Sequence, residues 1–490
     1  MCCKRKIQVF LFGLFFIPAA FSQINVIPDS LANIRYSDSL HIHQKNGLRA
    51  ATSIFATNIG VWTFDRFILD GSFARINLNT MKENFKTGFV WDNDMFSTNL
   101  FAHPYHGGTY FNSARSNGMN FWQSMPYTVG GSLMWEFFME NEPAAINDFV
   151  ATTIGGAALG EITYRVSDLI IDDRAVGFDR FKREALTTLI SPLRGINRII
   201  SGDAWKHRSI QGNTIAKVPV MFYTSIGHRI IYDNSQRDAD VSNMVSYHLG
   251  MYYGNPFSVD NEQPYDFFSI KMSGNFFSQQ PLIDRFNVLG LLIAKDISLK
   301  NPKRQLSVGL FQHFNYYQSQ ADINNVSLSP YKISEAASAG PGLLYKSKPT
   351  KHTTFSCSAF LSGILLGASQ TDHFKYDKRD YNMGSGFSSK LNLEMQFGEK
   401  IRFVLNSEDY RLYSWVGYDP NSNGEISSNV QGDKGHSSLS VVRLSFNYII
   451  KKHLLFSTET SFNYRESIYD YYSPVNHSVK ENKISIGYVF

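Results

Sequence analysis

Two histidines in the first half of the chain are the residues best suited to carry chemistry. His103 and His106 stand three positions apart, and the carboxylates of Glu136 and Asp148 follow them. Histidine and carboxylate side chains together can transfer protons, and the same two types can bind zinc. Ser132 follows two glycines and could serve as a nucleophile with either histidine. These five residues form the candidate catalytic set.

The two histidines also have a structural interpretation, which the local sequence favours. Pro104 disfavours a helix at His103, and Gly107-Gly108 would end any turn. We therefore expect both histidines on a loop, where they form hydrogen bonds in a buried position. No metal is assigned on this basis, and the residues point to no particular cofactor.

Two glutamates lie within otherwise apolar helical stretches, where an unpaired carboxylate is costly. They are Glu136 and Glu161, and Arg115 or Arg165 is the expected partner. A buried salt bridge that fixes helix register is favoured over a carboxylic acid with a raised pKa. The candidate substrate-binding residues around these motifs are Tyr105, Arg115, Asn112, Asn147 and Glu161.

Small residues gather between Gly155 and Gly160, in the run Gly-Gly-Ala-Ala-Leu-Gly. Such a face lets helices approach closely, above all in membranes. A phosphate-binding glycine loop is the alternative, but the run lacks the Lys-Ser/Thr of a P-loop. Signatures of serine hydrolases, zinc proteases and paired-cysteine sites are missing from the sequence.

Three of these runs, taken in order, resemble a family of uncharacterised outer-membrane proteins of Gram-negative bacteria, described only as a domain of unknown function. The runs are His-Pro-Tyr-His-Gly-Gly at 103–108, Gly-Ser-Leu-Met-Trp-Glu at 131–136 and Gly-Gly-Ala-Ala-Leu-Gly-Glu at 155–161. The resemblance covers roughly residues 80 to 175. It implies a membrane-associated envelope domain attached to a barrel. It implies no established activity, so it assigns no catalytic residue.

Helices must position these motifs, because the pattern of apolar residues from Ala50 to about Ser201 is typical of helices. The expected helices cover Ala50–Leu69, Ile146–Ile171 with an interruption at Gly155-Gly156, and Phe178–Ile190. Asn141 to Pro143 forms a break, and Pro192 and Gly195 break the last helix.

Strands follow after about residue 215, where apolar and polar residues alternate with period two. In the segment 454–465, Leu454, Phe456 and Phe462 share one face and Glu459 lies on the other. Sandwich strands average about six residues, whereas these segments often exceed that length. The chain also ends on such a segment at Phe490, which resembles the C-terminal signal of bacterial outer-membrane barrels. We therefore predict a transmembrane β-barrel of about 12 antiparallel strands behind a mainly α-helical domain, with a soluble all-β fold as the alternative.

The expected strands lie near 216–232, 242–254, 265–278, 283–298, 303–319, 335–347, 352–368, 384–398, 400–417, 436–450, 453–466 and 477–490. The polar loop 418–434 is expected outside the cell and the link 398–400 in the periplasm. A barrel of this size is narrow. Its lumen should be largely filled by the inward charges Glu394, Arg402, Arg443, Glu459 and Arg465.

The N-terminus predicts export through the general secretory pathway to the outer membrane. Lys4, Arg5 and Lys6 precede an apolar core and small residues, which is typical of a signal peptide. We divide the chain into a signal peptide (1–22), a flexible leader (23–48), a helical domain (49–205) and the barrel (215–490). Removing three basic residues lowers the net charge of +5 to +2, which gives no electrostatic case for binding nucleic acid.

Three functions remain open at the level of sequence. The favoured one is a barrel that anchors a helical envelope domain for lipid handling, transport or assembly. The others are an outer-membrane hydrolase or acyltransferase acting on lipid or cell-envelope substrate, and a diffusive porin. The expected partners are outer-membrane lipids and, through the strand ending in Phe490, the barrel-assembly machinery.

Overall fold

A computed structural model describes most of the chain from residue 45 onward. It covers residues 45–91, 96–207, 218–233, 240–258, 263–278, 280–297, 304–319, 321–323, 326–328, 331–347, 353–374, 380–421 and 432–490. The predicted signal peptide and nearly all of the predicted leader lie outside these residues. So do the middle of the loop 418–434 and parts of several other loops.

The first part of the described chain is helical. Its elements are α3 (Gly47–Phe67), α4 (Leu78–Thr87), the π-helix η3 (Thr98–Ala102), α5 (His103–Arg115), α6 (Phe121–Phe138), α7 (Ile146–Val150), the π-helix η4 (Ala151–Gly155), α8 (Gly156–Ile170), α9 (Gly177–Ile190) and α10 (Pro192–Ser201). Asparagine side chains begin several of them: Asn46 accepts a bond from Arg49 N, and Asn120 forms a capping box with Gln123. Among the described helices, none combines the length and apolarity needed to cross a membrane.

The expectation of a loop at the two histidines is wrong, because His103 to Arg115 form α5. Pro104 is the second residue of α5, at the junction with η3, and the helical backbone continues through it. The chain enters α5 directly from η3, so the backbone is already helical at His103. Gly107 and Gly108 do not end the helix, because both are buried against another helix. Packing therefore outweighs the poor helix propensity of these residues.

The second part of the chain is a closed antiparallel barrel of twelve strands, as the alternation predicts. Its strands are β1 (Val220–Asp233), β2 (Asp240–Tyr253), β3 (Phe268–Phe276), β4 (Arg285–Asp296), β5 (Arg304–Gln318), β8 (Lys332–Ser347), β9 (Thr353–Gln370), β10 (Tyr381–Phe397), β11 (Ile401–Ser414), β12 (Gly435–Lys451), β13 (Leu454–Tyr469) and β14 (Val475–Val489). A small hairpin of β6 (Ala321–Ile323) and β7 (Val326–Leu328) stands apart from the barrel wall. The barrel closes where β1 pairs with β14, and Phe490 N donates to Phe222 O at 2.8 Å beside this seam.

The lumen is filled by inward-facing side chains. Two apolar clusters lie inside, one containing Ile231 and Leu412 and the other containing Phe311 and Leu344. Ion pairs cross the same interior: Arg443 contacts Glu408 at 2.7 Å, and the pairs Arg229–Glu481 and Lys390–Glu335 each lie at 2.8 Å. A cavity of about 20 Å³ beside Arg229 has room for roughly one water. The clusters and ion pairs fill much of the described lumen, while Arg402 and Glu394, toward one end, keep side chains 36% and 29% exposed.

The strand register turns all five expected charges into this lumen. Arg402 pairs with Glu394 at 3.2 Å, and Glu459 accepts a bond from Ser445 Oγ at 3.0 Å. Arg465 forms two hydrogen bonds of 2.8 Å with Asp372.

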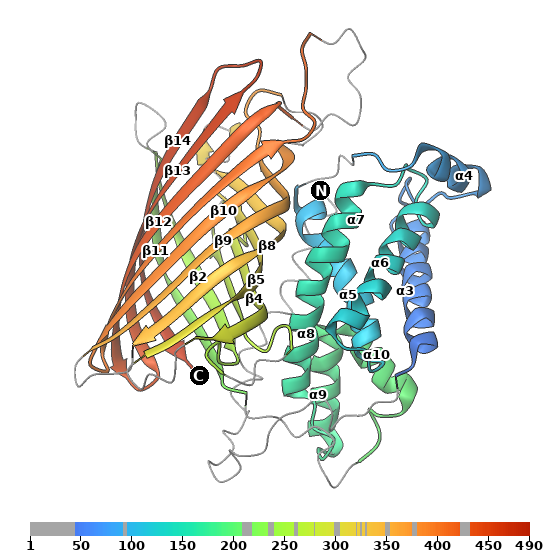
Figure 1. Ribbon diagram of the computed structural model, residues 1–490, viewed down its shortest axis with the longest axis horizontal. Helices are drawn as coiled ribbons and strands as arrows, with labels where there is room; N and C mark the ends of the chain where they lie inside the picture. Colours follow the sequence, from blue (N-terminus) through green and yellow to red (C-terminus); the bar gives the residue numbers. More distant parts are fainter. Residues whose placement is uncertain are drawn as a thin grey trace.

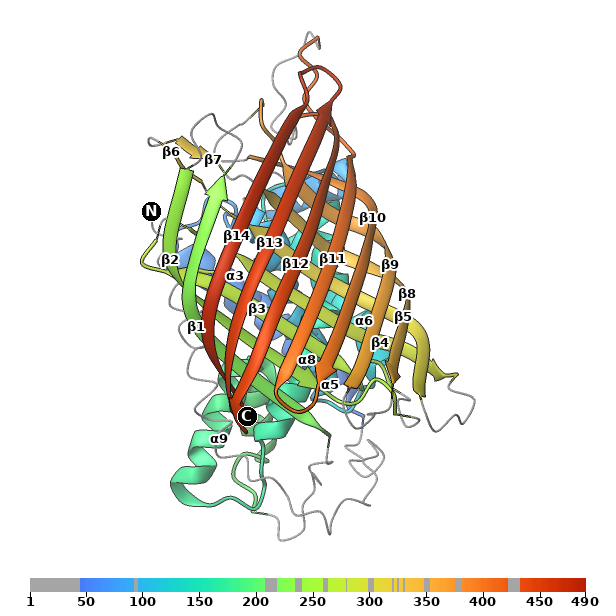
Figure 2. The ribbon, with the colours of Figure 1, turned by 90° about the vertical axis from the view of Figure 1, so that its left-hand side faces the viewer.

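The helical domain packs against the outside of the barrel. Figure 1 shows the bundle standing beside the wall formed by β4, β5 and β8, with α8 near the wall and α3 on the far side. Turned by 90°, most helices lie behind the barrel wall, and α9 lies beyond its lower end (Figure 2). The shared core joins helix residues such as Leu100 and Phe111 to outward-facing strand residues such as Phe268, Phe314 and Tyr381.

Candidate functional site

The three sequence motifs meet in the centre of the helical bundle, on α5, α6 and α8. Gly107 and Gly108 of α5 face Gly156 and Gly160 of α8, and the two backbones nearly touch. A Cβ added at Gly156 would lie 2.6 Å from the Gly107 carbonyl carbon. Gly131 of α6 makes room for the ring of Tyr110 in the same way. The glycine-rich runs are therefore the contact surfaces on which these helices pack.

A buried carboxylate, Glu161 of α8, holds two arginines. Arg115 of α5 donates to both of its oxygens at 2.7 and 3.0 Å, and Arg165 donates at 2.8 Å. Arg165 also reaches Pro264 O at 2.8 Å and the Asp266 carboxylate at 3.1 Å, in the β2–β3 connection. The predicted pairing of Glu161 is thus confirmed, with both arginines at once. The network ties α5, α8 and the barrel together.

His106 lies against an aromatic and amide group instead of a carboxylate. Its Nε2 is 2.9 Å from the Tyr110 hydroxyl, and that hydroxyl donates to Asn58 Oδ1 of α3. The imidazole packs edge-on against the Trp135 ring at a centroid distance of 4.9 Å. These contacts join α3, α5 and α6. The spacing of residues in the sequence did not indicate that Asn58 takes part.

His103 is the histidine that meets a carboxylate. Its Nε2 lies 3.5 Å from Asp148 Oδ1, and the same oxygen accepts a 2.8 Å bond from Asn147 Nδ2. The His103 side chain is 14% exposed and that of Asp148 is 6% exposed. Of the predicted catalytic set, the structure brings these two residues together.

The other candidates lie elsewhere in the bundle. Glu136 accepts a 2.8 Å bond from Ala145 N and so holds the start of α7. Asn112 Nδ2 donates to Thr163 Oγ1 at 2.8 Å, and Tyr105 is half-buried on α5. Ser132 Oγ is buried and forms no hydrogen bond within the described residues, so no Ser–His pair is present there.

These contacts define what the arrangement can do. No group of three or more His, Cys, Asp or Glu side chains within the described ranges is placed to hold a metal. The polar groups of the motifs mainly bind one another and the backbone, as in a packed core. His103 and Asp148 pair an imidazole with a carboxylate, the two group types of a common acid/base unit, but the 3.5 Å contact is not a hydrogen bond.

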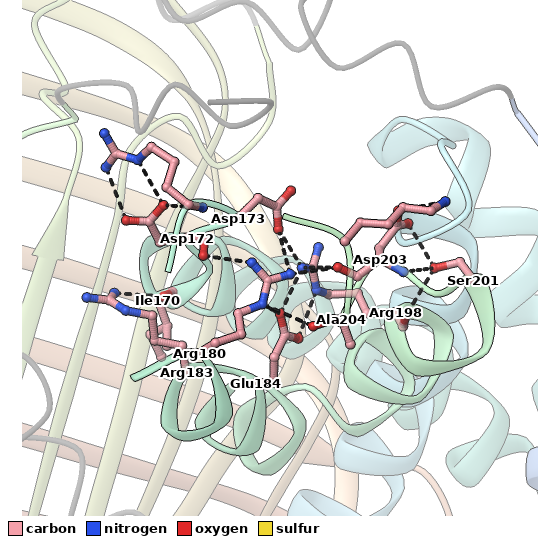
Figure 3. Close-up of polar contacts among 12 residues, drawn as sticks. Ile170, Asp172, Asp173, Arg180, Arg183, Glu184, Arg198, Ser201, Asp203 and Ala204 are labelled. Carbon is pink, nitrogen blue, oxygen red and sulfur yellow. Dashed lines mark hydrogen bonds and ion pairs between the residues drawn. The ribbon is translucent and has the colours of Figure 1, made fainter. Parts of the chain in front are cut away.

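A second ionic cluster, which the sequence reading missed, fixes the end of the bundle (Figure 3). Asp173 Oδ1 accepts bonds from Arg180 at 3.1 Å and from Arg198 at 2.7 Å, and Glu184 binds the same two arginines. Burial lowers the pKa of Arg198, but its bonds to Glu184 and Asp173 outweigh this and raise it. The spacing of Arg180 and Glu184, four residues apart on a predicted helix, was the available signal.

Polar side chains also join the bundle to the barrel wall. Gln312 of β5 points outward, accepts a 3.0 Å bond from Tyr265 and donates to Ile154 O of η4 at 3.0 Å. Asn99 of η3 donates to the Tyr381 hydroxyl of β10 at 2.8 Å. Buried polar groups need such partners, and on this wall the helices supply them.

Comparison with family models gives one match in this region. Residues 88–193 match the family described as "Domain of unknown function (DUF3943)". The matched residues run from the end of α4 to the first turn of α10 and contain all three motifs. The domain of unknown function expected from the motifs is therefore found. Comparison with curated proteins finds no match.

Comparison with solved structures finds outer-membrane barrels. The NanC porin is 10% identical, with 54% of this chain and 98% of that chain covered and a TM-score of 0.27. The outer-membrane channel DcaP of Acinetobacter baumannii is 9% identical, with 56% and 97% covered and a TM-score of 0.24. The toluene transporter TodX of Pseudomonas putida is 10% identical, with 55% and 89% covered and a TM-score of 0.22. At these identities the likeness concerns the barrel fold alone.

Proposed function

We propose that this protein is an outer-membrane protein whose sealed barrel anchors the helical domain, and that this domain handles envelope lipids. The observation that carries the proposal is the position of the domain on the outer wall of the barrel. Residues on the outside of a membrane barrel face the lipid phase. A domain attached there is placed to contact lipids, whereas a periplasmic domain would attach at one end of the barrel.

The filled lumen supports an anchoring role over a diffusive pore. A pore needs an open path for water, and the described part of this lumen contains paired charges and apolar clusters instead. The uncovered side of the barrel carries exposed apolar residues such as Leu444, Phe462 and Ile484, as a lipid-facing wall requires.

A lipid-directed hydrolase or acyltransferase is the second candidate, and the His103–Asp148 pair is the observation that favours it. The carboxylate can orient the imidazole, which then accepts or donates a proton. The buried Ser132 weighs against a serine nucleophile, because no histidine among the described residues bonds to it.

One experiment tests both candidates. A deletion strain is complemented with the wild-type chain or with His103→Ala, and both envelope lipid composition and protein abundance are measured. We expect the deletion to change the lipids, and both chains to restore them. Unchanged lipids in the deletion strain would overturn the lipid role. Failure of a normally abundant His103→Ala chain to restore them would favour the enzyme instead.

A further inference from the structure

We propose that the helical domain lies within the outer membrane beside the barrel, with the outer face of α3 against lipid acyl chains. This inference rests on the proposed function, since it requires the barrel to be inserted in the membrane. It adds an interaction surface, formed by α3 and α6, and a partner chemistry, the hydrocarbon of the bilayer.

The height of the bundle along the barrel is the first argument. Arg165 of α8 lies over the ring of Tyr253, the last residue of β2. Tyr253 lies at the barrel rim nearest the C-terminus of the chain. Phe96 and Asn99 contact Tyr381, which begins β10 at the opposite rim. The bundle therefore contacts the wall from one rim to the other. Whatever surrounds the rest of the barrel between these rims also surrounds the bundle.

The outer surface of α3 is the second argument. Between Leu48 and Phe64 the exposed side chains of this helix are all uncharged. They are Leu48, Ala51, Thr52, Phe55, Ala56, Ile59, Gly60, Thr63 and Phe64. At about 1.5 Å per residue this face is roughly 24 Å long. The apolar band of outer-membrane barrels is about 25 Å tall.

Several polar residues of α3 and α6 point into the bundle, although Thr52, Thr63 and Gln123 are exposed. Asn58 of α3 and Ser124, Thr128 and Glu136 of α6 are all almost fully buried. The exposed face of α6 carries Trp122, Gln123, Pro126, Gly130 and Phe138, again without a charge. This arrangement, apolar outside and polar inside, is the one expected of helices that meet lipid.

Charged residues appear at the two ends of the bundle. On α4, at one end, Lys82, Glu83 and Lys86 are exposed. On and beside α9, at the other end, the side chains of Arg174 and Lys182 are about half exposed. Charges at both ends with an uncharged band between them match the two water-facing surfaces of a bilayer. The uncharged band on the bundle continues the apolar outer wall of the barrel. We therefore expect lipid acyl chains, and not a protein partner, to cover it.

Spin labels measure the depth of these residues directly. In the full-length protein, with Cys2, Cys3 and Cys357 replaced by Ser, single cysteines are introduced as Ala56→Cys and Ile59→Cys on α3. Ile484→Cys on the lipid-facing wall and Lys82→Cys on α4 serve as controls. Each labelled protein is reconstituted into phosphatidylcholine vesicles, and nitroxide relaxation by oxygen and by a water-soluble nickel complex is compared.

We expect the oxygen-to-nickel ratio at 56 and 59 to match that at 484 and to exceed that at 82 several-fold. The inference is wrong if the ratio at positions 56 and 59 matches that at position 82 while position 484 still reports lipid. The barrel would then be inserted in the membrane without the helical domain. If 484 also behaves as water-exposed, the barrel is not inserted and the proposed function fails with it. Two α3 positions guard against the loss of one variant to misfolding.

Discussion

At the scale of single residues, Glu161 is the position on which the helical bundle most depends. One fully buried carboxylate binds both Arg115 and Arg165, and Arg165 also pairs with Asp266. We expect Glu161→Gln to remove the negative charge that these two buried guanidinium groups share. Such a loss typically costs about 3–5 kcal/mol. Thermal unfolding of the purified protein in detergent, followed by helical circular dichroism, should show a clearly lowered midpoint.

Glu83→Gln is the matched control for this prediction. Glu83 pairs with Lys86 on α4, but both side chains are mostly exposed. An exposed pair contributes little, so the midpoint should stay close to that of the wild type. Equal midpoints for the two variants would show that the Glu161 network does not hold the bundle.

The residue contacts differ in how far the sequence could anticipate them. A carboxylate in an apolar helical stretch needs a cation, which correctly predicted Arg115 and Arg165 as partners of Glu161. The bond between His106 and Tyr110 spans four residues and would have been visible had α5 been recognised as a helix. Asn58 could not be predicted, because its contact depends on how α3 packs against α5.

At the scale of elements, the approach of α5 to α8 is the contact most sensitive to side-chain size. We expect Gly156→Ala to destabilise the bundle even though alanine favours helices by about 1 kcal/mol over glycine. The added Cβ would lie 2.6 Å from the Gly107 backbone, which forces the helices apart. Overpacking of this kind costs about 1–3 kcal/mol. The measurement is the midpoint of thermal unfolding.

Gly60→Ala provides the comparison within the same domain. A Cβ at Gly60 would meet nothing within 4 Å, so only the gain in helix propensity remains. We expect a midpoint equal to or above that of the wild type. If Gly156→Ala were as stable as Gly60→Ala, the close approach of α5 and α8 would not contribute to stability.

The elements themselves followed from the sequence more closely than their arrangement did. The strand predicted near 453–466 is β13 (Leu454–Tyr469), and the helix predicted at Phe178–Ile190 is α9 (Gly177–Ile190). Period-two and helical patterns reveal which face of an element is apolar. They do not reveal whether lipid, a lumen or another helix covers that face. The position of the bundle outside the barrel therefore could not be predicted from the sequence.

At the scale of the whole molecule, the filled lumen predicts that the protein does not conduct ions. Inward charges such as Arg229 and Glu481 are paired, and apolar clusters lie toward both rims. Purified protein added to a planar lipid bilayer should insert without discrete porin-like current steps. A porin measured in parallel serves as the positive control. Regular conductance steps from the wild-type chain would contradict a sealed barrel.

The barrel has two different sides: one wall is covered by the helices, and the other is not. Strands β2 to β5 and β8 to β10 carry outward side chains, including Gln312, that rest on helices. After the helices the chain forms β1 and then these strands, whereas β11 to β14 come last. The helices and the wall that they cover are therefore close to each other in the sequence. A half-formed sheet could be shielded by its own helices before the last strands close the cylinder, so that insertion begins from a preassembled unit and not from twelve bare strands.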